Sequence, residues 1–530
     1  MQRFDYKQLL STPTGRRRFL IGAGAMTGLA VATQFSRRVI AQPSFSDYPF
    51  KLGIASGDPL PRSVVLWTRL APDPLNGGGM PEQNVLVQWQ IAANQSMSKV
   101  VRSGTAIAVP EWGHSVHINV QGLEPGRDYW YQFKVGSEVS PIGRTRTAPN
   151  RGDRLNKFRF AFASCSNYEQ GYYAAYKYMA QDDLDVVVFL GDYIYEGASN
   201  QNALRPHEGN GEPVTLLGYR NRYAQYKSDP DLQAAHAAFP WIVTPDDHEV
   251  DNNWAGGIPQ DPELQSPEAF LQRRAAAYQA YYEHMPLREL SQPQGSSIQL
   301  YRKLTFGDLV EFDVLDTRQF RTDQPCNDGI KPRCAEAFDP NATLTGTPQE
   351  KWLFHNLKNS SARWNVIAQQ IVFTQVDWTA GPDTTYNLDA WDGYVAARQR
   401  ILDFLSQNQP ANPIVISGDS HASWVSDLKA DYNNPDSAIV GTEFAGTSIT
   451  TSFTASSRIE EALPDSPWIK YFNGRQRGYV RCSLSPQLCQ ADYRLLSPSP
   501  ESGPTVSNRD TPITTAASFE LPNRGVVEPT

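Results

Sequence analysis

The segment VVVFLGDYIYE, residues 186–196, decides the fold class of this chain. It begins as a short apolar run, typical of a strand buried on both faces of a parallel sheet, and then turns to a glycine and the acidic residue Asp192. Unusual polar residues also follow the apolar runs at residues 158–163, 241–244 and 413–417, and residues 364–368 form a further run. Helical patterns occur at 171–180, 267–283 and 395–406. We therefore predict an α/β fold with a layered core of sheets and helices.

The polar residues that follow four of these strands are the candidates for a functional site. In strand order they are Cys165, then Asp192 and Tyr195, then Asp247 and His248, and finally Asp419 and His421. Ligands of open α/β sheets bind beyond the carboxyl ends of the strands, so we expect the four loops to meet at one place.

The types of these residues indicate a metal site. Thiolate, phenolate, carboxylate and imidazole groups together suit a ferric ion beside an oxygen-seeking divalent ion better than a structural zinc ion. We expect Asp192 to bridge two cations. Such a site favours phosphoester hydrolysis by in-line attack of a metal-bound hydroxide or oxide. The predicted metal ligands are Cys165, Asp192, Tyr195, Asp247, Asp419 and His421.

Two further residues are expected to act in catalysis beside Asp192. His248 is placed to give a proton or a hydrogen bond to the leaving oxygen, and Arg318 is a candidate for contacting the phosphate. Structural alternatives remain open, because Arg318 could pair with Asp313 or Asp316 and Cys165 could be a buried inert thiol.

The ends of the chain predict export and a loose tail. Three arginines at residues 16–18 precede an apolar, small-residue stretch at 21–33 and a small-residue cleavage site near residue 41, which is a twin-arginine signal pattern. The stretch is short for a membrane span, although an uncleaved anchor stays an alternative. We expect a secreted or periplasmic protein that uses the twin-arginine export machinery, without a stable membrane span. Residues 496–530 are rich in Ser, Pro and Thr and predict a loosely structured tail.

The part of the chain before the α/β core is predicted to be a β-sandwich. Short alternating strands at 63–68, 85–89, 117–120 and 129–133 are separated by turn residues, and residues 123–129 are similar to the fibronectin-type turn into a strand with an inward tyrosine. The expected domains are therefore a signal peptide at 1–41, a fibronectin-III or immunoglobulin-like sandwich at 47–149, a catalytic domain at 150–495, and the tail.

Composition and cysteine count narrow the function classes. A net charge of −8 with 20% charged residues gives no basic surface for nucleic acid. The five cysteines allow two local disulfides, between Cys326 and Cys334 and between Cys482 and Cys489, which leaves Cys165 unpaired.

The motifs resemble the calcineurin-like metallophosphoesterase superfamily, and specifically its PhoD-type alkaline phosphatase and phosphodiesterase family. The superfamily's Gly-Asp-x-x-Tyr motif, in the form of its purple-phosphatase branch, stands at 191–195. Its Asn-His-Glu motif appears as Asp-His-Glu at 247–249 and its Gly-His-x-His motif as Gly-Asp-Ser-His at 418–421, while Cys165 takes the place of the first Asp-x-His. The segments 246–254 and 315–319 are similar to the PhoD-type version.

Departures from the superfamily pattern bear on the metals. Asp247 replaces an amide ligand and Asp419 replaces a histidine, and Gln369 and Gln370 stand where another histidine ligand is usual. The resemblance therefore implies one ferric ion, Fe(3+), and one or two calcium ions, Ca(2+), rather than two zinc ions.

Competing functions stay open at this point. The run Gly418 to Ser423 suggests a serine hydrolase, but it lacks the usual nucleophile elbow. A binding protein for cell-wall carbohydrate, using the sandwich, is an alternative from another class. Within the family, the substrate is a phosphate monoester or diester, and a phospholipase D-like diesterase is one form of the latter. We expect a monomer.

Overall fold

The computed structural model describes residues 45–209, 211–434, 436–497 and 506–530. Its larger sheet has ten strands, among which β9, β10 and β11 run parallel at the centre. In spatial order the strands are β24 (Glu528–Pro529), β23 (Ile513–Pro522), β22 (Leu488–Leu496), β21 (Gly478–Leu484), β9 (Phe158–Ala163), β10 (Val186–Phe189), β11 (Pro240–Val243), β1 (Ile54–Leu60), β2 (Ser63–Arg69) and β5 (Ser115–Gln121).

A second sheet of seven strands packs against the larger one. The parallel strands of its centre are in register, with Val366 opposite Ile414. Its order is β12 (Arg302–Phe306), β13 (Val310–Val314), β15 (Trp364–Ala368), β17 (Pro413–Ser417), β19 (Ile439–Ala445), β18 (Ser423–Lys429) and β20 (Ile469–Asn473).

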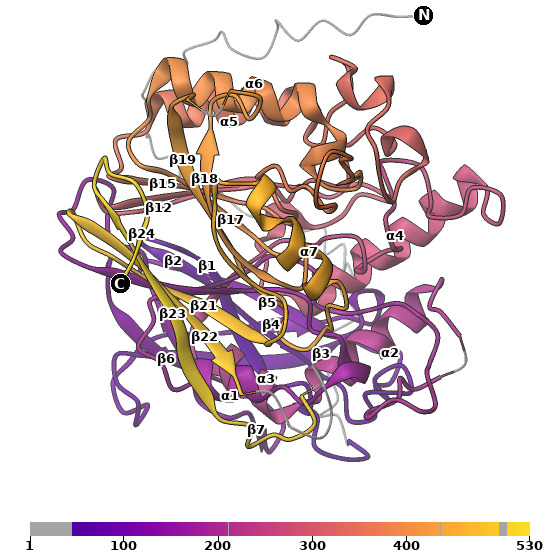
Figure 1. Ribbon diagram of the computed structural model, residues 1–530. Helices are drawn as coiled ribbons and strands as arrows, with labels where there is room; N and C mark the ends of the chain where they lie inside the picture. The colour runs from indigo at the N-terminus through magenta and orange to yellow at the C-terminus, as the bar shows by residue number, and fades with distance from the viewer. Residues whose placement is uncertain (1–44, 210, 435, 498–505) are drawn as a thin grey trace, which may run out of the picture. The chain divides into compact units, whose positions relative to one another are not determined.

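The helices cover the outer faces of the two sheets (Figure 1). The first four pack on the ten-stranded sheet and the next two on the seven-stranded sheet. The helices are α1 (Ala174–Met179), α2 (Leu216–Lys227), α3 (Pro230–Ala238), α4 (Pro267–His284), α5 (Gly346–Asn359), α6 (Val395–Asn408) and α7 (Ser456–Ala462).

The alternation of side chains along β9 explains these layers. Phe158, Phe160 and Phe162 enter the core between the sheets, while Ala161 and Ala163 face the helices. Their small size lets α1 approach closely, because successive side chains of a strand point to opposite faces. The order helix, sheet, sheet, helix confirms the predicted α/β class, and every strand and helix quoted from the sequence is present within a few residues.

The N-terminal strands do not all stay in a sheet of their own. A five-stranded sheet contains β4 (Val100–Ala108), β3 (Val85–Ala92), β6 (Asp128–Val135), β7 (Glu138–Val139) and β8 (Gly143–Arg146). In contrast, β1 pairs in parallel with β11, with Gly57 opposite Trp241, so β1, β2 and β5 extend the larger sheet. The fibronectin-III-like assignment and the boundary after residue 149 therefore stay predictions.

The predicted loose tail is wrong for the residues that the structure describes after 505. Strand β23 pairs along its length with β22, and Phe519 and Leu521 are buried in the core between the sheets. The exposed residues of β23 include Thr514 and Thr515, which belong to a segment rich in Ser and Thr, so composition concealed this strand. The predicted signal peptide, residues 1–41, lies outside the described residues.

The cysteines follow the prediction only in part. Cys326 and Cys334 form the expected disulfide, and the chain between them contains β14 (Ile330–Lys331), which pairs with β16 (Tyr386–Asn387). Cys482 and Cys489 are free buried thiols on β21 and β22, because register places Ala491 opposite Cys482. The expected second disulfide is therefore absent from the structure.

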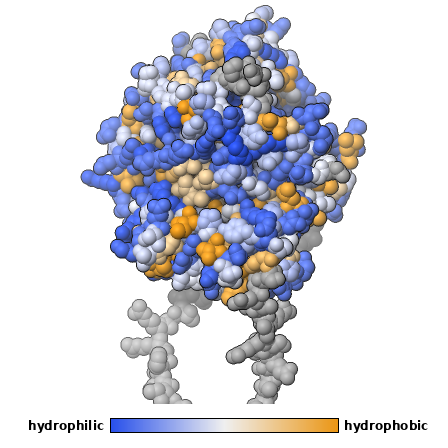
Figure 2. All heavy atoms as spheres, turned by 90° about the horizontal axis from the view of Figure 1, so that it is seen from below, coloured by the Kyte–Doolittle hydropathy of each residue, from blue (hydrophilic) through white to orange (hydrophobic). Residues whose placement is uncertain are grey.

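The surface shows no extended apolar band on the face in Figure 2, where hydrophobic residues lie in small groups among hydrophilic ones. Within the described ranges, no helix combines the length and the apolar character that a membrane span requires.

Candidate metal centre

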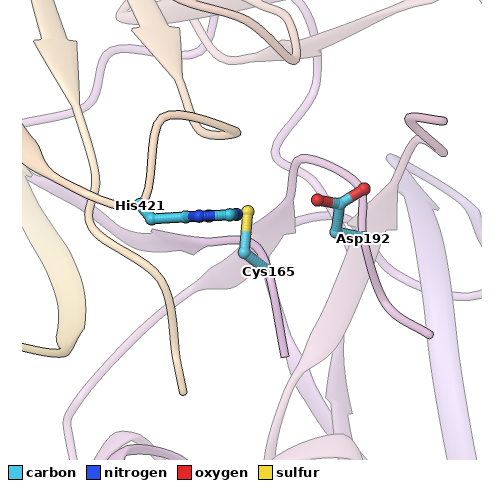
Figure 3. Close-up of side chains that lie close together, drawn as sticks. All are labelled: Cys165, Asp192 and His421. Atoms are coloured by element: carbon cyan, nitrogen blue, oxygen red, sulfur yellow. The ribbon is translucent and has the colours of Figure 1, made fainter. Parts of the chain in front are cut away.

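The four predicted loops meet at the carboxyl ends of β9, β10, β11 and β17. The first two are joined by main-chain hydrogen bonds, in which Cys165 N donates to Gly191 O at 3.1 Å and Ser166 N donates to Asp192 O at 2.9 Å. Figure 3 shows the Cys165 thiol beside the imidazole of His421, with the carboxylate of Asp192 near them. Ligand atoms of these three residues all lie within 4.8 Å of one another.

The main chain of the loops is bent to aim these side chains. Cys165, Asp192, Asp419 and His421 all have positive φ angles, between 55° and 58°. Residues other than glycine rarely adopt this left-handed conformation, and such residues cluster at functional sites. Gly191, with φ of 104°, must be glycine, because a β-carbon there would lie 2.5 Å from the β-carbon of Asp246.

Asp192 is shared by three groups of potential ligands. It lies with Cys165 and His421 in one group, with Asp247 and His248 in a second, and with Asp246, Asp247 and Asp419 in a third. This is the arrangement expected of a carboxylate that bridges two cations.

Tyr195 lies beside the first group. Its hydroxyl donates to Asp192 Oδ2 at 3.0 Å and lies 3.2 Å from His421 Nε2. The structure therefore brings all six predicted ligands together, and adds Asp246, which the sequence argument quoted but did not assign.

The charges of the centre are not balanced by the protein alone. Burial, followed by the repulsion of neighbouring carboxylates, raises the pKa of Asp192 and of Asp419 well above the usual range. Burial also raises the pKa of Asp246 to about 7 and the pKa of the Cys165 thiol. One oxygen each of Asp192, Asp246 and Asp247 is buried without a hydrogen-bond partner. Buried, unpartnered carboxylate oxygens are costly unless cations or protons compensate them.

Arg318 compensates one side of this cluster. Its Nε donates to Asp246 at 2.6 Å, and its terminal nitrogens donate to both oxygens of Asp389 at 2.8 and 2.7 Å. Burial works against ionisation of Asp247, but Arg318 and His248 lower the pKa of Asp247 below its usual value. The guanidinium is buried and engaged by carboxylates, which favours a positioning role for Arg318, and the expected contact of Arg318 with phosphate stays a prediction. The guanidinium pairs with Asp246 and Asp389 instead of Asp313 or Asp316, although the main-chain nitrogen of Arg318 donates to Asp316 Oδ1 at 3.1 Å.

His248 is oriented by a residue that the sequence argument did not assign. Its Nδ1 lies 2.7 Å from Glu196 Oε2, and its ring packs on Tyr195 with centroids 4.1 Å apart. Burial lowers the pKa of His248, but the carboxylates of Glu196 and Asp247 outweigh this effect and raise it above the usual value. The imidazole is therefore held as a hydrogen-bond donor at the edge of the centre.

Glu249 joins two of the loops through their main chain. Its carboxylate accepts hydrogen bonds from the peptide nitrogens of Asp192, Tyr193 and Asp246. Glu196 directly follows the motif at 191–195 and Glu249 ends the motif at 247–249, so both could have been found there, whereas nothing around Asp389 in the sequence marks it.

Ser420 does not have the surroundings of a catalytic serine. Its hydroxyl donates to the carbonyl of Ala422 at 3.4 Å and accepts from Trp424 Nε1 at 3.0 Å. A serine nucleophile needs a general base within hydrogen-bond reach, and neither partner is one.

Comparisons with known proteins agree with this geometry. The model of the PhoD-like phosphatase family matches residues 160–493, and the model of the PhoD-like phosphatase N-terminal domain matches residues 34–149. Alkaline phosphatase D of Bacillus subtilis (strain 168) is 50% identical over 522 residues, which cover 96% of this chain and 89% of that protein.

A solved structure titled "Structure of PhoD" superposes with a TM-score of 0.87 at 50% identity, covering 92% of this chain and 93% of the other. The PhoD-like phosphatase model and the relative each span more than half of the sequence. The chain therefore belongs to the PhoD-like phosphatase family and is a phosphoric ester hydrolase.

Proposed function

We propose that this chain is an exported, metal-dependent alkaline phosphatase and phosphodiesterase that works with a ferric ion and calcium. The observation that carries the proposal is the meeting of a thiol, a phenol, an imidazole and four carboxylates in one buried place. The name of the Bacillus subtilis relative, alkaline phosphatase D, supports the substrate class.

The donor set fits these metals. The unpartnered oxygens of Asp192, Asp246 and Asp247 provide hard ligands of the kind that calcium prefers. The thiol of Cys165 and the phenol of Tyr195 are anionic donors that favour a ferric ion when deprotonated. We assign Cys165, Asp192, Tyr195 and His421 to iron, and Asp192, Asp247 and Asp419, with Asp246, to calcium.

The bound cations supply positive charge that activates the attacking water and offsets the charge of the phosphate. The side chains of this chain do the rest. Glu196 holds His248 through Nδ1, which leaves Nε2 to donate a proton or a hydrogen bond to the leaving oxygen. Arg318 is a positioning residue, because it holds Asp246 and keeps Asp247 ionised.

Export through the twin-arginine machinery, a periplasmic or secreted location and a monomeric state belong to the same proposal. The export route and the location rest on the arginines at residues 16–18 and on the small-residue cleavage pattern near residue 41. Lysine replacement of Arg16 and Arg17 should retain the enzyme in the cytoplasm, as fractionation and activity assays would show.

Replacement of Cys165 tests the metal centre. In Cys165→Ala we expect loss of iron by elemental analysis, loss of visible charge-transfer absorption, and loss of hydrolysis of both p-nitrophenyl phosphate and bis-p-nitrophenyl phosphate. Cys489→Ala is the matched control, since Cys489 is also a buried free thiol but lies in the core between the sheets. Full iron content and absorption in Cys165→Ala would exclude this thiol as a ligand.

The ratio of monoester to diester hydrolysis, measured with and without added calcium after chelation, identifies the preferred ester. A chelated enzyme that keeps full activity would contradict the metal dependence.

A further inference from the structure

Arg477 is a buried cation without an anionic partner behind the thiol side of the metal centre. Its side chain is only 2% exposed, and it stands immediately before β21. Among the residues that the structure describes, no carboxylate lies within ion-pair distance of its guanidinium. Arg318, by contrast, is equally buried but paired with carboxylates on both sides. Burying an unpaired charge is unfavourable, so its presence requires a compensating interaction.

The partners of Arg477 are the main chain and one hydroxyl. One terminal nitrogen donates to the carbonyl of His421, to Thr451 O at 2.7 Å and to Ser448 Oγ at 2.9 Å. The other donates to the carbonyl of Gly474. A single planar group therefore ties together the loop that carries His421, the loop after β19 and the turn before β21.

The second of these loops reaches the other ligands. Thr451 Oγ1 lies 2.9 Å from Cys165 O and 2.9 Å from the hydroxyl of Tyr195. Ile449 N donates to Ser164 O at 3.0 Å, directly before Cys165. Arg477 therefore contacts Thr451, which in turn contacts Cys165 and Tyr195, and Arg477 donates directly to the main-chain carbonyl of His421.

We propose that Arg477 is a positioning residue of the iron side of the centre, which fixes Cys165, Tyr195 and His421 in one geometry. Its guanidinium also places a positive charge behind the thiolate of Cys165 and the phenolate of Tyr195. The inference rests on the proposed metal centre. It explains why the arginine has no carboxylate partner, because the thiolate and phenolate ligands provide the negative charge once the centre is loaded. Partners behind metal ligands set ligand orientation and metal affinity in the same way in other metalloproteins.

Cobalt(II) titration of the metal-free protein tests this inference, because a thiolate ligand gives cobalt a near-ultraviolet charge-transfer band. We expect Arg477→Gln to bind cobalt about 10–100-fold more weakly and to show a shifted band. Arg477→Lys retains the charge but cannot reach all four acceptors, so we expect a shifted band with a smaller loss of affinity. A purely structural arginine would change the unfolding temperature without moving the band.

Arg481→Gln is the matched control. Arg481 lies on β21, four residues further along, but is partly exposed and paired with Asp182 and Asp492. We expect this variant to retain the wild-type band and affinity.

The outcomes separate the two proposals. If wild type and Cys165→Ala give the same cobalt spectrum, the thiolate site itself fails. If Cys165→Ala loses the band while Arg477→Lys and Arg477→Gln keep both band and affinity, only the role of Arg477 is overturned. Should Arg477→Gln fail to fold by circular dichroism, the judgement rests on Arg477→Lys and on Thr451→Val. Thr451→Val removes the hydroxyl beside Tyr195 and should shift the band with little loss of stability. An unshifted band in both Thr451→Val and Arg477→Lys would overturn the inference.

Discussion

Replacement of Arg318 by methionine distinguishes a structural arginine from one that binds phosphate. The side chain is 1% exposed and makes three hydrogen bonds of 2.6 to 2.8 Å with Asp246 and Asp389, which are also buried. Methionine fills most of the volume but leaves both carboxylates without their cation. Removing one partner of a buried ion pair costs about 3–5 kcal/mol, so we expect the free energy of unfolding of Arg318→Met to fall by that amount.

The matched control is Arg400→Met. Arg400 also makes a bidentate pair, with Glu350, at 2.9 to 3.1 Å, but about a third of its side chain is exposed. An exposed pair contributes about 0–1 kcal/mol, so this variant should unfold almost as the wild type does. Both proteins are compared without metal by denaturant unfolding, which prevents a change in metal content from being mistaken for lost packing.

The unfolding data decide between the two roles. A stability of Arg318→Met close to that of Arg400→Met, together with a large rise in KM, would refute the positioning role and favour a contact of Arg318 with the substrate. A double-mutant cycle with Asp389→Asn isolates the coupling, because both residues then lack their charge.

Two further predictions concern stability away from the metals. Burial raises the pKa of Asp313 to about 7, so the folded protein holds this proton more tightly than the unfolded chain does, and the associated stability is lost as pH rises from about 4 to above 7. Asp313→Asn, which can keep the hydrogen bond from Asn356, should therefore unfold at a higher temperature than wild type above pH 7 and at an equal one near pH 4; a difference independent of pH would contradict this cause. Replacing both Cys326 and Cys334 by serine removes a link across a sequence separation of 8, which should cost about 2–3 kcal/mol of unfolding free energy. Thermal unfolding with and without a reductant measures it, and a wild-type protein indifferent to the reductant would contradict it.

The sequence predicted the metal loops because each follows a strand buried on both faces. The run before Gly191 leaves no polar position for five residues, so the glycine and Asp192 mark the end of the strand without ambiguity. Because parallel strands have their carboxyl ends at the same edge of a sheet, the side chains that follow four such strands lie close together.

The groups that support the ligands could not be predicted in this way. Arg477 and Asp389 are far from the motifs in sequence, and each acts through contacts that only the packing of the two sheets creates. Strand β1 shows the same limit, because its pairing with β11 joins residues such as Gly57 and Trp241, which are 184 positions apart, and carries no local pattern. Short-range periodicity specifies a strand but not its neighbour.

The arrangement of charge explains why so many acids are tolerated in a buried place. The carboxylates of Asp192, Asp246, Asp247, Asp389 and Asp419 are all buried or nearly so, while Arg318 and Arg321 are the arginines that pair with members of this set. Two cations cannot balance five carboxylates, so the remaining negative charge must be met by metal ions or by protons. The raised pKa values of Asp192 and Asp419 mean that, without metal ions, these carboxyl groups tend to hold protons. The excess negative charge lies on the side of the aspartates, whereas Arg477 stands on the side of the Cys165 thiol. The centre therefore offers two unlike positions, one for hard divalent ions and one for an ion that binds a thiolate ligand.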